Sequence, residues 1–582
     1  MIKSNYFTTN SDILLHFEKF IPWKQIVPIY ENNFHDAKVF QQTGNELLAS
    51  APTSVEEAVE YYRTILETAG DIAGNFVSEH VKSMDIQGAK YENGKVIHPK
   101  EMIDSVNKAK ESGIQAYGFQ RKYGGLGLPF TVRALMGEII YRVDTSFAIA
   151  FGCVNLGEIL ERIASEEMKK DWLPRMAAGE FCAAMGLTEP NHGSDLPNIK
   201  TKATKQEDGK WVLNGTKRFI TQACGLGETP SIILTLARSG GNGARGLSFF
   251  LVHSKDIQVA GIEKKLGLHA SPTCEVVFEN TPALLIGEEG FGLVRYTMGM
   301  LNGARMGIAA QGVGMATAAY EEAKIFASTR IQFGKPIEEI PAIKKMLRRM
   351  EREIMAMRCL TLEGGRTVDM YYWRMEHLKE AGKSDKEISN DEEVRHWMKL
   401  ADLLTPVSKY YCSEMCNRIA YDALQIHGGS GFTEDYDIAR IYRDARIITI
   451  YDGTTQIQVM AAIGGVISGM APTGHFRKYL LSEMEEFSPS SRLKTLFEKL
   501  EEAVSVYKNI SSAEVRDSFS LELVEVATRL LAGIQLEKTA KLLESESQTS
   551  RLKQADEFNI DSLAIALGNI EKMKNFANIE IL

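Results

Sequence analysis

The chain has 582 residues and a formal net charge of −9; 44% of its residues are hydrophobic and 25% are charged. Several hydrophobic cores are expected, since a single core stops growing at about 250–300 residues. The acidic balance without a long basic run argues against nucleic acid as a partner, and no apolar run approaches the roughly 20 residues that cross a bilayer.

The first part of the chain is predicted to be helical. Ser54 and Glu57 are spaced as a capping box, which indicates the start of an amphipathic helix. The glycine-rich segment 123–129 interrupts the helical pattern, and a long apolar helix is expected from Val132. We therefore expect an N-terminal helical domain over 1–180.

Short apolar runs bounded by Gly, Pro or Asn then replace the helical pattern. Asp208-Gly209 and Asn214-Gly215 are dipeptides typical of tight turns between strands. Together these features predict a central antiparallel β-domain over 181–290. The expected strands are 211–213, 216–221, 232–236, 247–252 and 276–278.

Helical periodicity returns from Gly290. Long helices are predicted over 293–329, 342–375 and 391–427, with the charged segment 379–393 as an exposed helical connection. These helices indicate a C-terminal four-helix-bundle domain over 291–470.

The last part of the chain is predicted to be an additional helical region over 471–582. Gly464-Gly465 and the segment 469–474 are expected to interrupt the helices before it. Within it Leu493, Phe497 and Leu500 share one face of an amphipathic helix.

The order of these elements predicts an α+β multidomain fold. Helices, then an all-β insert, then helices form separate packed layers rather than a parallel α/β sheet. No Gly-x-Gly-x-x-Gly stands between a strand and a helix, so any dinucleotide is expected to be held in a non-Rossmann way.

Four motif regions carry the chemistry. The regions are 187–195 (LTEPNHGSD), 218–221 (RFIT), 330–335 (RIQFGK), and 425–432 (QIHGGSGF) with the nearby 443–446 (RDAR) and 451–458 (YDGTTQIQ). Their order and setting resemble the acyl-CoA dehydrogenase family from about residue 60 to 465. The resemblance implies FAD-dependent α,β-dehydrogenation of an acyl-CoA thioester to the 2-enoyl-CoA, with an electron-transferring flavoprotein as acceptor.

The first two motifs point to an aromatic or anionic ligand. Small residues let backbone N–H groups approach such a ligand closely, and the resemblance assigns Thr188, Gly193 and Ser194 to the flavin ring and pyrophosphate. Phe219 and Thr221 alternate on a strand and face the same side. By resemblance Phe219, where many relatives carry Trp, covers one flavin face and Thr221 bonds near the reactive nitrogen. The alternatives are an ordinary turn and a core aromatic residue.

The third and fourth motifs imply a site shared between subunits. In the family, the residues corresponding to Arg330 and Phe333 contact the FAD of a neighbouring subunit, and Gln425, Gly428 and Gly429 serve its adenosine half. The alternative for Arg330 is a cation that complements a helix dipole. The resemblance therefore implies a homo-oligomer.

Asp452 stands where the family places its catalytic carboxylate, commonly Glu. By resemblance it removes the α-proton, its backbone N–H and an FAD ribityl hydroxyl bind the thioester oxygen, and Thr454 and Gln456 contact FAD. The alternative is a structural role, because Asp-Gly favours turns and Asp caps helices.

The substrate contacts are also assigned by resemblance. Arg305 and Gly453 are expected to contact the substrate, although a helical Arg is also often a solvated or paired surface charge. Some relatives place the base on the helix that holds Arg305. Ala304 occupies that position here and cannot accept a proton.

The length of the chain resembles the longer branch of the family, which includes very-long-chain and methylthiopropionyl-CoA dehydrogenases. In that branch the extension covers surface that shorter members use to form tetramers, so a homodimer is expected. The alternative is an appendage that contacts a partner or a membrane.

Other functions remain open from the sequence. They are an acyl-CoA or nitroalkane-type oxidase, a desulfinase-like variant, and a catalytically silent flavin-binding scaffold. The start of the chain lacks signal-peptide features and the seven cysteines are scattered, which favours a cytoplasmic protein without a disulfide framework or a zinc site.

Overall fold

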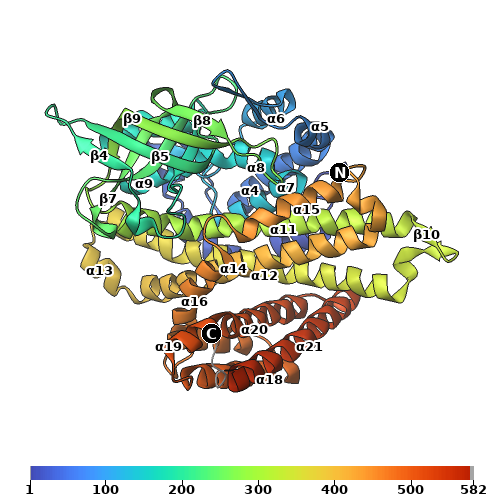
Figure 1. Ribbon diagram of the computed structural model, residues 1–582. Coiled ribbons are helices and arrows are strands. Elements are labelled where there is room, and N and C mark those ends of the chain that lie inside the picture. The colour runs from blue at the N-terminus through green and yellow to red at the C-terminus, as the bar shows by residue number, and fades with distance from the viewer. Residues whose placement is uncertain (1, 577–582) are drawn as a thin grey trace. The chain divides into compact units, whose positions relative to one another are not determined.

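The computed structural model describes residues 2–576, and the chain forms two compact units. The first holds Phe34–Leu301 with the residues that precede Asn10, and the second holds Asn10–Asn33 with the chain from Asn302 on. The predicted α+β class is confirmed, with helices before and after a β-domain (Figure 1). The exact domain boundaries stay predictions.

The helices of the first unit follow the predicted pattern. Helix α4 (Val55–Asp71) begins at Ser54, whose hydroxyl accepts the N–H of Glu57 at 3.1 Å. The capping box is only half formed, because the Glu57 carboxylate accepts from Thr53 instead. Helix α7 (Phe130–Val143) is the predicted apolar helix, and most of its side chains are buried. The other α-helices are α3 (His35–Thr43), α5 (Val81–Gln87), α6 (Lys100–Glu111), α8 (Thr145–Gly152), α9 (Glu158–Ile163) and α10 (Glu166–Ala177).

The β-domain is a seven-stranded sheet of mainly antiparallel strands. β4 pairs with β5, β5 with β9, β9 with β7 and β8, and β7 with β6, all antiparallel. β3 joins β6 in parallel, and β4 meets the end of β6 in parallel. The strands are β3 (Cys182–Gly186), β4 (Lys202–Lys205), β5 (Trp211–Thr221), β6 (Ser231–Arg238), β7 (Leu247–His253), β8 (Gln258–Ile262) and β9 (Thr273–Ile286); a separate hairpin pairs β1 (Lys90–Glu92) with β2 (Lys95–Ile97).

Both faces of the sheet are covered. Along β6 the side chains of Ile232 and Leu234 enter one core cluster, which they share with Phe119 and Leu173 of the helical part of the unit. The intervening Ile233 enters a second cluster on the other face. This explains why β6 is an almost continuous apolar run rather than an alternating one.

One of the two predicted turns is wrong. Asp208-Gly209 forms the turn between β4 and β5, with Gly209 at φ +84°. Asn214-Gly215 instead lies inside β5, at an irregularity in its pairing with β9. Glycine is needed there for close packing, since a Cβ would lie 2.7 Å from the Cα of Thr201.

The second unit is built on long helices. They are α11 (Met298–Thr329), α12 (Pro341–Glu380), α14 (Glu392–His427) and α16 (Thr455–Gly469). α14 packs against α12 and α16, and α2 (Trp23–Tyr30) from the N-terminal segment packs against α12. The remaining elements of this part are α1 (Ser11–Leu15), β10 (Ile331–Gln332), β11 (Lys335–Pro336), α13 (Asp385–Asn390) and α15 (Asp437–Ala445).

Two local predictions for these helices have different outcomes. The charged connection is confirmed as an exposed segment that contains α13, which begins at a complete capping box of Ser384 and Glu387. Gly464 and Gly465 do not interrupt the chain but lie inside α16. At Gly465 a Cβ would lie 3.3 Å from Leu403, so its small size lets α16 approach α14 closely.

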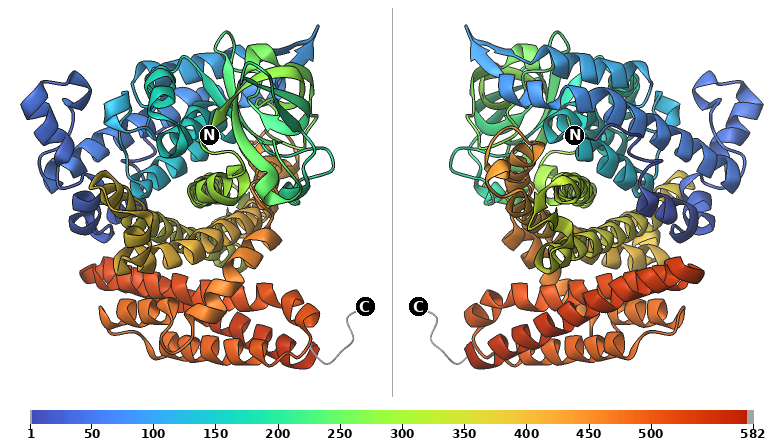
Figure 2. Two further views of the ribbon diagram at one scale, coloured as in Figure 1. Left: turned by 90° about the vertical axis from the view of Figure 1, so that its left-hand side faces the viewer. Right: turned by 90° about the vertical axis from the view of Figure 1, so that its right-hand side faces the viewer.

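The C-terminal region is helical, as predicted. α20 packs against α18 and α21, and also against α12 and α16 (Figure 1, Figure 2). The predicted face of Leu493, Phe497 and Leu500 on α18 is buried. The helices are α17 (His475–Glu485), α18 (Ser491–Lys508), α19 (Ala513–Ser518), α20 (Ser520–Lys541) and α21 (Ser545–Phe576).

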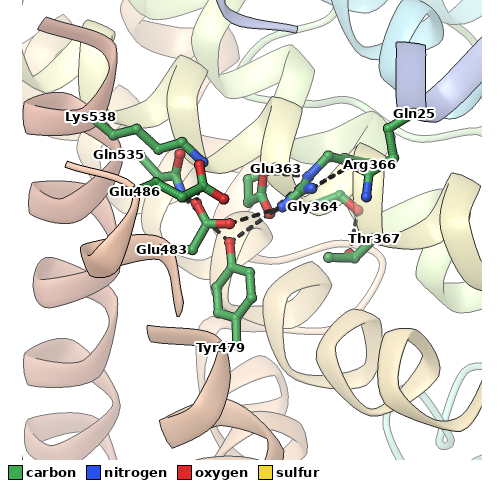
Figure 3. A network of polar contacts seen from close by, with 10 residues as sticks. All are labelled: Gln25, Glu363, Gly364, Arg366, Thr367, Tyr479, Glu483, Glu486, Gln535 and Lys538. Carbon is green, nitrogen blue, oxygen red and sulfur yellow. Dashed lines mark hydrogen bonds and ion pairs between the residues drawn. The ribbon is translucent and has the colours of Figure 1, made fainter. Parts of the chain in front are cut away.

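A buried polar network joins α12, α17 and α2 (Figure 3). The Arg366 Nη2 lies 2.6 Å from Glu363 and 3.2 Å from Glu483, and the Arg366 Nη1 donates to Gln25 at 2.8 Å. The Tyr479 hydroxyl donates to Glu363 at 2.5 Å. Buried charges hold elements together only when each is paired, as here.

Candidate active site

The loop after β3 is fastened to β5 by a buried ion pair. The Glu189 carboxylate accepts the backbone N–H groups of Lys200 and Thr201 at 2.6 and 2.8 Å and lies 2.9 Å from the Lys217 ammonium. Lys217 is fully buried, and burial lowers its pKa to about 8 although Glu189 opposes this shift. Sequence reasoning missed both roles, because β5 holds several polar residues and Lys217 does not stand out among them.

The residues of this loop that were predicted to bind a ligand are half-buried or exposed. Thr188 is half-buried and its carbonyl accepts the Arg218 N–H at 2.9 Å. Gly193 and Ser194 are exposed. A Cβ at Gly193 would meet no atom within 4 Å, so no part of the described chain fills the space above this glycine.

Phe219 sits on a strained bulge of β5. The pairing of β5 with β9 shifts between Lys217 and Ile220, and Phe219 has φ +63°. Its ring is 54% exposed, while Ile220 is buried on the other side. Positive φ is unusual for a bulky residue and is often found at functional sites. Thr221 is half-buried, and among the described residues its hydroxyl has no hydrogen-bond partner.

In the second unit, Arg330 and Phe333 belong to a short exposed hairpin. β10 pairs with β11 around Phe333 and Gly334, which have φ +54° and +75°. Phe333 is 90% exposed. Arg330 is also exposed and has no ion pair with the described part of the chain. A tight turn that presents an aromatic ring to solvent fits contact with another molecule.

The glycine-rich motif follows the end of α14. Gly428 ends the helix at φ +58°, and a Cβ at Gly428 or Gly429 would meet nothing within 4 Å. Gln425 is exposed on the last turn. His427 is buried: its Nδ1–H donates to the Ala423 carbonyl at 2.8 Å. The histidine therefore supports the helix end, while the glycines leave an open surface.

Asp452 lies in a turn whose carbonyl groups are held by two other side chains. Asp452 and Gly453 have φ +51° and +89°. The Gln458 Nε2 donates to both of their carbonyl oxygens at 3.1 Å. The Lys409 Nζ donates to the Gly453 carbonyl at 2.5 Å. The sequence analysis gave neither residue a role, although Gln458 is the last residue of the 451–458 motif.

The residues on either side of this turn are also anchored. The Tyr451 hydroxyl donates to Gln311 of α11. Thr454 is the N-cap of α16, since its hydroxyl accepts the Ile457 N–H. The alternative reading of Asp452 as the cap is therefore wrong. Gln456, the other predicted FAD contact of this motif, is exposed on the first turn of α16.

The reactive groups of Asp452 are left available. Within the described residues neither its carboxylate nor its backbone N–H has a hydrogen-bond partner. The side chain is half-buried; burial raises its pKa, and the Lys409 ammonium opposes this shift. A carboxylate with raised pKa and free lone pairs can accept a proton.

Arg305 is buried on α11, which excludes the alternative of a solvated surface charge. Its Nη1 donates to the Asn302 side chain at 3.0 Å, and Asn302 in turn donates to Asp402 at 3.2 Å. The Arg305 Nε has no partner in the described part of the chain. An orphaned buried donor of this kind fits an anionic or carbonyl ligand.

The fold is that of a flavin-dependent acyl-CoA oxidoreductase. Family models match the acyl-CoA dehydrogenase N-terminal domain over 60–180, the middle domain over 184–281 and the C-terminal domain over 290–370 and 390–465. The chain therefore belongs to the acyl-CoA dehydrogenase family.

Individual relatives support this assignment. The chain is 33% identical to 3-methylmercaptopropionyl-CoA dehydrogenase of Ruegeria pomeroyi over 69% of this chain and 70% of the relative. It is 28% identical to butyryl-CoA dehydrogenase of Megasphaera elsdenii, with a TM-score of 0.58 over 70% and 98% of the two chains. An acyl-CoA dehydrogenase of Bacillus anthracis, complexed with FAD, shares the fold at a TM-score of 0.72 over 88% of each chain and 24% identity.

FAD is the cofactor of this family, and the residues present fit it. In the first unit the exposed ring of Phe219 and the open space above Gly193 suit a flat aromatic group and a pyrophosphate. In the second unit the open surface at Gly428 and Gly429 suits an adenosine. The described residues contain no cluster of three or more metal-ligating side chains, and none of the described helices is both long and apolar enough to span a bilayer.

Proposed function

We propose that Asp452 is the base in the α,β-dehydrogenation of an acyl-CoA to the 2-enoyl-CoA. The observation that carries the proposal is that, within residues 2–576, neither the carboxylate nor the N–H of Asp452 has a hydrogen-bond partner while the surrounding turn is anchored. The carboxylate takes the α-proton. The pair of electrons left on the α-carbon forms the double bond as the β-hydrogen departs as hydride. When bound, FAD accepts this hydride.

The free N–H of Asp452 has a role in the same step. An α-proton beside a thioester is only weakly acidic, and a donor placed at the thioester oxygen stabilises the enolate-like transition state. Raising the pKa of the carboxylate by burial makes it a better proton acceptor. One residue thus supplies the base and one oxyanion donor.

The cofactor contacts are divided between two subunits in this proposal. By resemblance to the family, Thr188, Gly193, Ser194, Phe219 and Thr221 would hold the flavin and pyrophosphate of FAD. Thr454 and Gln456 would be further FAD contacts. Support comes from the 90% exposure of Phe333 and from the nearby Arg330, which forms no ion pair with any residue that the structure describes. Both features suit contact with the FAD of a second copy. The proposed contacts of that second copy are Arg330, Phe333, Gln425, Gly428 and Gly429.

The remaining assignments follow from the family. Arg305 and Gly453 contact the acyl-CoA, the assembly is a homodimer, and an electron-transferring flavoprotein accepts the electrons. A cytoplasmic location stays a prediction.

The test is anaerobic bleaching of the flavin by acyl-CoA substrates with the parent and Asp452→Asn. This change keeps the shape of the side chain but removes the proton acceptor, so we expect the rate of bleaching to fall by about 10²–10⁴-fold. Asp208→Asn is the matched control, because Asp208 also precedes a glycine in a turn but is exposed.

Equal rates for Asp452→Asn and the parent would refute the base assignment. Failure of every acyl-CoA to bleach the flavin would instead indicate a catalytically silent scaffold. Rapid turnover in air without an added acceptor would identify an oxidase.

A further inference from the structure

We infer that Lys409 is a positioning residue for catalysis: together with Gln458 it holds the Asp452–Gly453 turn so that the short Asp452 side chain reaches the substrate. The inference rests on the proposed function of Asp452. Within the described residues, the hydrogen bonds from Lys409 and Gln458 to the turn go to its carbonyl oxygens, so we infer that they act through Asp452 rather than on the substrate.

The conformation of the turn explains why it needs support. Asp452 is in the left-handed region at φ +51°, which non-glycine residues rarely adopt. Such a conformation persists only where surrounding contacts enforce it. Gly453 at φ +89° leaves no room for a side chain, since a Cβ would lie 2.6 Å from the Gln458 Nε2.

Lys409 is placed at a cost in free energy. It is fully buried in α14, and a lysine is almost never fully buried without a partner. Its hydrogen bond within the described chain goes to the Gly453 carbonyl. Asp452 and Glu414 attract its charge and Arg305 repels it. Burial lowers the pKa of Lys409 to about 8, so at neutral pH the ammonium is still mostly charged.

Gln458 is, like Lys409, a buried polar side chain that donates to the carbonyl groups of the turn, but it is neutral. It is buried on the first turns of α16, and its Nε2 donates to both carbonyl groups. Its Oε1 has no partner among the described residues. A buried unsatisfied acceptor is unfavourable. We therefore infer that the contribution of Gln458 comes from the two carbonyl groups that its Nε2 binds.

The support of the turn by Lys409 and Gln458 explains how an aspartate can replace the glutamate that is common in the family. Asp is one methylene shorter, about 1.5 Å in reach, and a misplacement of about 1 Å can reduce a rate on the order of a hundredfold. Lys409 holds the Gly453 carbonyl and Gln458 holds both carbonyl groups, so the carboxylate and the N–H of Asp452 take no part in these hydrogen bonds. The backbone position then supplies the precision that side-chain length does not.

The test is Lys409→Met in the FAD-loaded protein. We expect a rate of anaerobic flavin bleaching that is about 10–100-fold lower, with FAD content and acyl-CoA affinity within about twofold of the parent. In the pH dependence of the bleaching rate, the fall at low pH should move to higher pH. The reason is that the variant lacks the Lys409 cation, which opposes the raised pKa of Asp452. Lys399→Met on the exposed part of α14 is the control, with no change expected.

Gln458→Met is the second variant, should Lys409→Met not fold. We expect a slower rate without a shift of the acidic limb, since no charge is removed. The inference is overturned if the variant that folds retains the parent's rate, or loses only thermal stability. Its failure is distinguishable from failure of the proposed function, which is decided by Asp452→Asn alone.

Discussion

In the β-domain, the loop that carries Thr188 depends on one buried charge pair. Glu189 and Lys217 are both buried, and together they fasten the loop of Thr188 to the strand of Phe219. Breaking such a pair is costly because the remaining charge stays buried without compensation.

Glu189→Gln is therefore expected to lower the free energy of unfolding by about 3–5 kcal/mol. Urea titration of the purified protein measures this. Glu263→Gln serves as the control, because the Arg218–Glu263 pair is partly exposed, and its loss should cost at most about 1 kcal/mol. Adding Lys217→Met to Glu189→Gln should recover most of the loss; no recovery would show that the pair is not the cause.

At the scale of elements, a buried cluster of charged residues joins the N-terminal part of the second unit, Asn10–Asn33, to the helices α12 and α21 of the same unit. Asp12 at the start of α1 pairs with Arg358 of α12 and Arg551 of α21. His16 lies 3.3 Å from Arg551 and 3.8 Å from the Cys359 Sγ. Burial, with a contribution from the two arginines, lowers the pKa of His16 to about 3, while Asp12 opposes this shift.

This cluster predicts a loss of stability on acidification. Between about pH 6.5 and pH 3 the unfolded chain binds a proton at His16 that the folded chain does not, so stability falls by about 1.4 kcal/mol per pH unit. From pH 7 to pH 5 the loss from this residue is about 2 kcal/mol. His16→Gln should lose that much less between these two pH values in denaturant titrations. The exposed His35→Gln is the control, and an equal pH dependence in both variants would contradict the assignment.

Sequence patterns were sufficient for most elements but not for their contacts. The apolar periodicity of α7 and α18 and the turn at Asp208-Gly209 are local features, and the structure confirms them. The dipeptides Asn214-Gly215 and Gly464-Gly465 looked equally local. Gly215 and Gly465 instead allow close approach to Thr201 and Leu403, which no local pattern reports.

At the scale of the whole molecule, the C-terminal region is an integral part of the second unit. α20 packs against α16, which begins directly after the Asp452 turn. Arg366 of α12 reaches Glu483 of α17, whose carboxylate also lies 2.8 Å from the Lys538 Nζ of α20 (Figure 3). Buried charges of this kind do not fit an appendage that detaches.

Arg366→Met should therefore destabilise the protein by about 3–5 kcal/mol, because Glu363 and Glu483 stay buried with less compensation. The midpoint of urea unfolding measures this. Arg492→Met is the matched control: the Arg492–Asp556 pair is largely exposed and should contribute at most about 1 kcal/mol. Equal shifts for the two variants would show that the buried network does not hold the region in place.

The sequence by itself determined the class of fold, the order of its parts and the identity of the candidate base, because periodicity and short motifs are encoded by neighbouring residues. Only the tertiary structure decided what holds that base. Lys409 carries no local signal, since a lysine in a helix is ordinary. Its contact joins residues that are 44 positions apart in the chain, and such pairing is a property of packing rather than of sequence spacing. Gln458 is the last residue of the 451–458 motif, but the motif does not show that its side chain binds the carbonyl groups of the turn before α16.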